Sequence, residues 1–215
     1  MRRRRVIWAC LLSSFVAAHL PEPRVEAGGY RRSVVLHGTQ FPEALLVLVD
    51  NSGSMGGDPY ACAIRQARWV VEQATDGARV RFAAFGGEVV WQEADPSKWT
   101  KLPDAEAVGV AVAWLQHRGT GGSTAMAHAV EAALAVEEPQ IGVVVISDCE
   151  PDGGHDDTRA RIERANARRK ERAVIGVISV APNADAKRFA ILVADAAGGP
   201  VVELQPKKDE AGAKR

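Results

Sequence analysis

The residues best suited to chemistry are three polar side chains that follow a run of apolar ones. Asp50, Ser52 and Ser54 form an Asp-x-Ser-x-Ser pattern. In an extended loop alternate residues point to the same side, so their oxygens face one place, and Gly53 lets the backbone bend between them. Ligands made only of oxygen suit a hard cation, here Mg²⁺, with Mn²⁺ or Ca²⁺ as alternatives. The same residue types also cap helices, so this pattern alone leaves a structural role open.

Two further segments place oxygens in comparable positions. Gly122, Ser123 and Thr124 form a loop that leads into a predicted helix, and Asp148 directly follows a second apolar run. Thr124 or its neighbour Ser123 can supply a ligand hydroxyl, although Thr124 could instead cap the helix that it precedes. The sequence therefore offers two carboxylates and three hydroxyls for one candidate site.

The elements that must position these side chains alternate along the chain. Continuous apolar or alternating runs predict strands at 44–50, 79–85, 88–91, 141–147, 174–180 and 200–204. Helical spacing and caps predict helices at 59–75, 104–116, 124–136, 157–172 and 185–196. This order predicts a doubly wound α/β fold, with a mainly parallel central sheet, one short antiparallel edge strand at 88–91 and helices on both faces. In such folds the loops at the carboxyl ends of the strands meet at one edge, which brings the three polar segments together.

Taken together, these segments resemble the metal-ion-dependent adhesion site of the von Willebrand factor A family. DNSGSM at 50–55, GGST at 121–124 and ISD at 146–148 occur in the family's order, and the resemblance covers roughly residues 40–205. It implies that Ser52 and Ser54 bind the cation directly and that Thr124 does so in the ligand-bound form. It also implies that Asp50 and Asp148 act directly or through water. Loop residues near the metal would then contribute to partner binding, namely Gly53, Gly122 and Ser123.

The resemblance implies a binding module and no enzymatic activity. A cation held largely by hydroxyls keeps an open coordination position, which a Glu or Asp of an unidentified protein partner can fill. One alternative is an intracellular subunit of the same fold that works beside an ATPase. Another is a Mg²⁺-dependent phosphoryl hydrolase with Asp50 as nucleophile. That chemistry also needs a general acid and a cationic group, and Arg118 is the only basic residue near the site loops.

Domain organisation follows from composition. Residues 1–27 combine an arginine-rich start with a short apolar run, which predicts a signal peptide or N-terminal anchor and hence an exported protein: secreted, periplasmic or cell-surface. Residues 28–39 are an extension, 40–205 the domain and 206–215 a polar tail. Lys plus Arg and Asp plus Glu both number 27, so no basic field indicates nucleic acid, and a membrane enters only if the first segment stays uncleaved.

Two cysteines remain after such a cleavage, Cys62 and Cys149. In an exported protein they can form a disulfide, whereas two free and mostly buried thiols are the alternative. The sequence leaves both open, because a disulfide depends on a Cα geometry that spacing does not supply.

Overall fold

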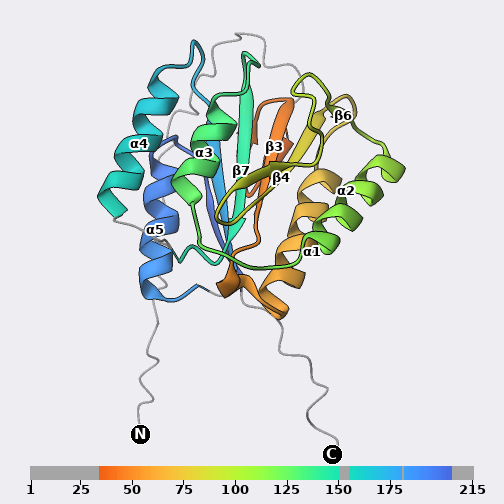
Figure 1. The fold of residues 1–215 in the computed structure, drawn as a ribbon. Coiled ribbons are helices and arrows are strands. Elements are labelled where there is room, and N and C mark those ends of the chain that lie inside the picture. The colour runs from red at the N-terminus through yellow and green to blue at the C-terminus, as the bar shows by residue number, and fades with distance from the viewer. Residues whose placement is uncertain (1–33, 151–154, 181, 205–215) are drawn as a thin grey trace, which may run out of the picture.

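The apolar runs form a central sheet covered by helices on both faces (Figure 1). The computed structural model describes residues 34–150, 155–180 and 182–204. The parallel strands are β3 (Ala44–Asp50), β4 (Arg79–Phe85), β7 (Ile141–Ser147), β8 (Val174–Val180) and β9 (Val201–Leu204). Two short strands pair antiparallel with β4, namely β5 (Val89–Trp91) and β6 (Thr100–Lys101). The doubly wound α/β class is therefore confirmed, with β6 as an additional short strand.

The order of the strands places the reversal of the winding at the centre of the sheet. It runs β5-β4-β3-β7-β8-β9, so the chain builds outward from β3 on one side and from β7 on the other. All seven residues of β3 are buried, as are all seven of β7. The carboxyl ends of β3 and β7 are therefore neighbours at the switch point, where α/β sheets bind their ligands.

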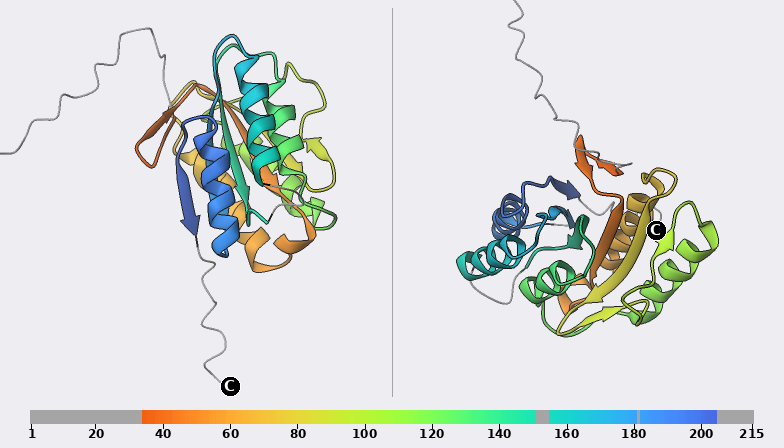
Figure 2. Two further views of the ribbon diagram at one scale, coloured as in Figure 1. Left: turned by 90° about the vertical axis from the view of Figure 1, so that its left-hand side faces the viewer. Right: turned by 90° about the horizontal axis from the view of Figure 1, so that it is seen from above.

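Helices cover the sheet in two layers, which Figure 2 shows from above. One face carries α1 (Asp58–Glu72) and α2 (Ala105–Arg118). The other carries α3 (Met126–Leu134), α4 (His155–Ala167) and α5 (Ala184–Asp195). Alternate residues of β3 serve the two layers, since Leu45 and Val47 pack toward α1 while Leu46 and Leu48 pack toward α3.

Helix ends differ from the sequence-based expectation mainly at α4, which ends at Ala167 and not at 172. The Asn166 side chain explains the difference. Its amide donates to the Ala173 carbonyl over 3.1 Å and its oxygen accepts from the Ala173 amide over 2.8 Å. This pairing turns the chain out of the helix and into β8, so the arginines after 167 belong to a loop.

An N-terminal hairpin was not expected from the sequence. Strands β1 (Val34–Leu36) and β2 (Thr39–Phe41) pair antiparallel across a turn at His37 and Gly38, both with positive φ. The hairpin delivers Phe41, which is fully buried, onto the sheet. A Cβ at Gly142 would lie 2.8 Å from the Phe41 ring, and one at Gly176 would lie 2.7 Å from it. The two glycines therefore make the space that the aromatic ring fills.

The two cysteines are free thiols, so the disulfide alternative is wrong. Cys62 is buried in the layer of α1 and Cys149 in the layer of α3, on opposite faces of the sheet. The predicted N-terminal segment and the polar tail lie outside the described residues. No helix within the described ranges is long and apolar enough to cross a bilayer.

Candidate metal centre

Asp50 is the last residue of the central strand β3, and its fully buried carboxylate is fixed by two hydrogen bonds. The Ser52 backbone amide donates to Oδ1 over 2.8 Å. The Ser147 hydroxyl, at the end of the neighbouring strand β7, donates to Oδ2 over 2.5 Å. These contacts orient the carboxylate at the switch point, and each oxygen keeps a lone pair for a further partner. Ser147 was not predicted as a site residue, although its position beside Asp148 was visible.

Ser52 and Ser54 lie on the turn that follows β3. A short 3₁₀ helix, η1 (Gly53–Met55), brings their hydroxyl oxygens to 3.1 Å of each other. Neighbouring oxygens around an octahedral Mg²⁺ lie roughly 3 Å apart, because each is about 2.1 Å from the ion. The predicted spacing of alternate residues thus gives two hydroxyls at the separation that one small cation requires.

Backbone hydrogen bonds tie this turn to the loop that carries Thr124. The Gly53 amide donates to the Gly122 carbonyl over 3.0 Å, and the Gly121 amide donates to the Asn51 carbonyl over 2.8 Å. Gly122 adopts a φ of 78° that favours glycine. A Cβ at Gly86, on the adjoining hairpin, would lie 3.0 Å from the Gly121 carbonyl. The predicted meeting of the first two loops is thus held by main-chain contacts that depend on small residues.

Thr124 and Ser123 have different surroundings. Thr124 is 5% exposed, whereas Ser123 is exposed and its hydroxyl lies beside Gly87. The N-cap residue of α3 is Ala125, one residue after Thr124. Thr124 is thus a buried hydroxyl on a loop bound to the Ser52 turn, and Ser123 faces the adjoining hairpin.

Asp148 completes the group from the end of β7 and is 6% exposed. Its Oδ1 accepts from the Glu150 amide over 3.1 Å, while its own amide donates to the Met55 sulfur over 3.2 Å. Cys149 has a φ of 61°, a left-handed conformation that bends the chain directly after Asp148. The bend and the methionine contact hold Asp148 beside the turn at 52–55.

The electrostatics of the group favour a cation. The pKa of Asp50 is raised to about 6, chiefly by burial and in smaller part by the Asp148 carboxylate, against hydrogen bonds from Ser147 and Ser52 that lower it. No ion pair among the described residues includes Asp50 or Asp148. Two buried carboxylates without a basic partner are costly unless a cation neutralises them. The donor set of carboxylates and hydroxyls therefore fits a hard divalent ion.

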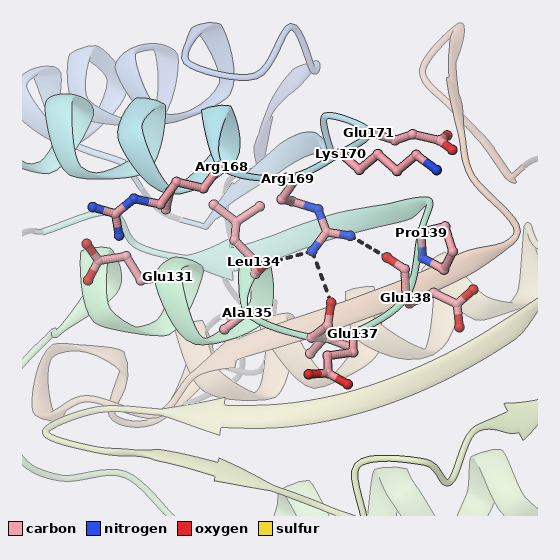
Figure 3. A pocket seen from close by; sticks show the side chains of 12 residues that line it. Glu131, Leu134, Ala135, Glu137, Glu138, Pro139, Arg168, Arg169, Lys170 and Glu171 are labelled. Carbon is pink, nitrogen blue, oxygen red and sulfur yellow. Dashed lines mark hydrogen bonds between the residues drawn. The ribbon is translucent and has the colours of Figure 1, made fainter.

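Within the described ranges, no group of three or more His, Cys, Asp or Glu is placed to hold a metal. A cavity of about 750 Å³ lies between the ends of α3 and α4 and contains none of the predicted site residues (Figure 3). Arg169 accounts for one wall, because its guanidinium donates to the carbonyls of Leu134, Val136 and Glu138. This arginine closes the end of α3, and its role is structural.

Comparison with known proteins agrees with the fold. The sequence profile of the von Willebrand factor type A domain matches residues 44–204. No curated protein matches the chain. A von Willebrand factor type A structure from Catenulispora acidiphila is 16% identical with a TM-score of 0.63, and the match covers 77% of this chain and 39% of that one.

Two other solved structures match over most of their own length. An aerotolerance-related membrane protein from Bacteroides fragilis NCTC 9343, carrying multiple mutations to serines, is 16% identical with a TM-score of 0.56, covering 75% of this chain and 90% of that one. The SpRpn10 VWA domain is 14% identical with a TM-score of 0.56, covering 77% and 89%. At these identities the likeness concerns the fold.

The fold and the candidate site together define the class of protein. It is a doubly wound α/β domain whose polar loops meet at one edge of the sheet. The chain belongs to the von Willebrand factor type A domain family, since the family profile spans the sheet from β3 to β9.

Proposed function

We propose that this domain binds a divalent cation, Mg²⁺ in the first place, and through it an acidic side chain of a protein partner. The proposed ligands are Asp50, Ser52, Ser54, Thr124 and Asp148. The supporting observation is the pair of hydroxyls 3.1 Å apart at a site where Asp50 is fully buried and Asp148 is 6% exposed. Mn²⁺ and Ca²⁺ have the same preference for oxygen and are the alternative ions.

The arrangement of the carboxylates supports binding of an external acid. Both oxygens of Asp50 already accept a hydrogen bond, one from the Ser52 amide and one from the Ser147 hydroxyl. Such bonds withdraw charge from the carboxylate, and the hydroxyl ligands carry no net charge. A divalent ion bound there would keep an open position for a partner's Glu or Asp. The residues hold and orient, and they break no bond.

Export belongs to the proposal as well, and it rests on residues 1–27, whose arginine-rich start and apolar run are typical of a signal peptide. The partner would then be met outside the cytosol. An isolated C-terminal fragment starting after residue 27 in the culture medium or periplasm supports this part. Recovery of the full-length chain from the cytosol alone contradicts it and favours the intracellular assembly role.

Calorimetric titration of the full chain with MgCl₂, followed by a blocked glycine peptide that contains one Glu, tests the binding mechanism. Wild type should bind Mg²⁺ at one site and bind the peptide only when Mg²⁺ is present. Asp50→Asn and Thr124→Ala should lose peptide binding. Thr124→Ser should retain peptide binding because serine keeps the hydroxyl. Asp195→Asn, an exposed residue at the end of α5, is the matched control and should behave as wild type.

Peptide binding of equal strength in excess chelator would refute the proposal. So would Mg²⁺ binding that survives both Asp50→Asn and Thr124→Ala, because the cation would then occupy another place.

A further inference from the structure

A polar hollow of about 530 Å³ adjoins the proposed cation site. Asn51, which separates two of the proposed ligands, lines it together with Gly121 of the Thr124 loop. Two charged residues also line it, Arg118 at the end of α2 and Glu88 on the β4–β5 hairpin. The hollow therefore opens beside the loops that would present the cation to a partner.

Arg118 is exposed and held in place without a carboxylate. Its guanidinium carbon lies 5.8 Å from the centre of the Trp114 ring, one helical turn earlier, in a cation–π contact. None of the ion pairs in the part of the chain that the structure describes includes Arg118. Its charge thus remains available to a group that enters the hollow.

Tyr60 indicates that Arg118 lies near the cation site. Burial raises the pKa of the Tyr60 hydroxyl to about 12, while the charge of Arg118 lowers it and that of Asp50 raises it. One phenol, which donates to the Leu115 carbonyl over 2.6 Å, thus interacts with both charges. Asn51, the residue directly after Asp50, and Arg118 line the same hollow, so a ligand in that hollow would contact both the cation-site turn and the guanidinium.

We propose that Arg118 is a second anchor for the same partner, binding an additional carboxylate next to the one that enters the cation site. This inference rests on the proposed function and narrows the partner to an acidic segment with two carboxylates close in sequence. A guanidinium binds a carboxylate with two parallel hydrogen bonds, which a point charge does not. Because Trp114 already restrains the side chain, less rotational freedom is lost on binding.

Glu88 provides a test of whether the group that enters the hollow is acidic or basic. It lines the same hollow with a negative charge, and it is exposed. If the entering group is acidic, Glu88 opposes it, and Glu88→Gln should strengthen binding. If the entering group is basic, Glu88 is its partner and the same substitution should weaken binding.

Three blocked peptides of equal length, measured by calorimetry or NMR titration on the full chain in MgCl₂ at low salt, separate these cases. They contain one Glu, two Glu spaced by one glycine, or one Glu and one Lys. Wild type should bind the two-Glu peptide about two- to fivefold more tightly than the one-Glu peptide, beyond a statistical factor of about two. Arg118→Gln should remove that gain and leave one-Glu binding intact, whereas Arg118→Lys should keep part of it.

Arg188→Gln is the matched control, since it removes an equal charge from an exposed position on α5 and should leave every affinity unchanged. Equal binding of the one-Glu and two-Glu peptides by wild type, or an unchanged ratio in Arg118→Gln, overturns the second anchor alone. Tighter binding of the Lys peptide that Glu88→Gln abolishes also overturns it. Failure of all three peptides to bind in Mg²⁺ overturns the proposed function and this inference together.

Discussion

Replacing Asp50 by Asn should stabilise the domain without a cation and destabilise it relative to wild type with one. A rise in the pKa of Asp50 from 3.8 to about 6 corresponds to about 3 kcal/mol at a pH above both values. This is the cost of keeping a buried carboxylate ionised in the folded state. Asn is nearly isosteric. Its oxygen can accept from the Ser52 amide and its NH₂ can donate to the Ser147 hydroxyl, so most of that cost should disappear.

The pH dependence of the stability follows from the same shift in the pKa of Asp50. Since the folded-state pKa is raised above the unfolded one, wild type in chelator loses stability as the pH rises from about 4 to about 6, and Asp50→Asn lacks this loss. The difference between the two proteins should therefore grow over that window to about 1–3 kcal/mol in favour of the variant.

Urea denaturation followed by circular dichroism at pH 7.5, in EDTA and in saturating MgCl₂, measures the difference in stability between the two proteins without and with the cation. At Mg²⁺ concentrations about a thousandfold above Kd, wild type should gain about 4.1 kcal/mol and the variant little, so the order of stability reverses. The reasoning is refuted if Asp50→Asn is the less stable protein in EDTA, or if both proteins gain equally from Mg²⁺. An equal gain would mean that the cation binds away from Asp50.

Three other outcomes are expected. Phe41→Ala should lower the free energy of unfolding by about 3–5 kcal/mol in urea denaturation, because it empties the space over the glycines of β7 and β8; a loss below 1 kcal/mol would mean that the hairpin is not part of the core. Gly86→Val should push the Thr124 loop away and weaken Mg²⁺ binding in calorimetry, and unchanged affinity would contradict the role given to that close contact. Cys62 and Cys149 should react with a thiol reagent only after unfolding, and reductant should leave the melting temperature unchanged; a reductant-sensitive transition would contradict free thiols.

The strands could be predicted from the sequence because their apolar runs are long and interrupted by polar loops. β3, β4, β7 and β8 have the expected limits. In β3 and β7 the reason is that a strand buried on both faces stays apolar until its last residue, whereas β4 was predicted from its alternating start. The hairpin that carries Phe41 has no comparable pattern. Its position depends on glycines about a hundred residues or more further along the chain, and only the folded sheet brings them together.

The approach of the site loops to one another was predictable from the sequence, whereas the contacts that orient the side chains within the site were less so. The Asp-x-Ser-x-Ser spacing anticipates the proximity of Ser52 and Ser54, because local geometry decides it. The bond from Ser147 to Asp50 joins two strands that are adjacent only through the sheet order. Spacing along the sequence does not predict such a partner. The same is true of the Met55 sulfur, which accepts from the Asp148 amide.

The links among the strand ends have a consequence for transplanting the site. Asp50 is oriented by Ser147, Asp148 is held by Met55, and Gly53 is bonded to Gly122, so each turn is positioned by a residue of another turn. A linear peptide copying residues 50–55 should therefore show no measurable affinity for Mg²⁺. The smallest portable unit is two neighbouring strands with their following turns, together with the glycine loop that closes over them.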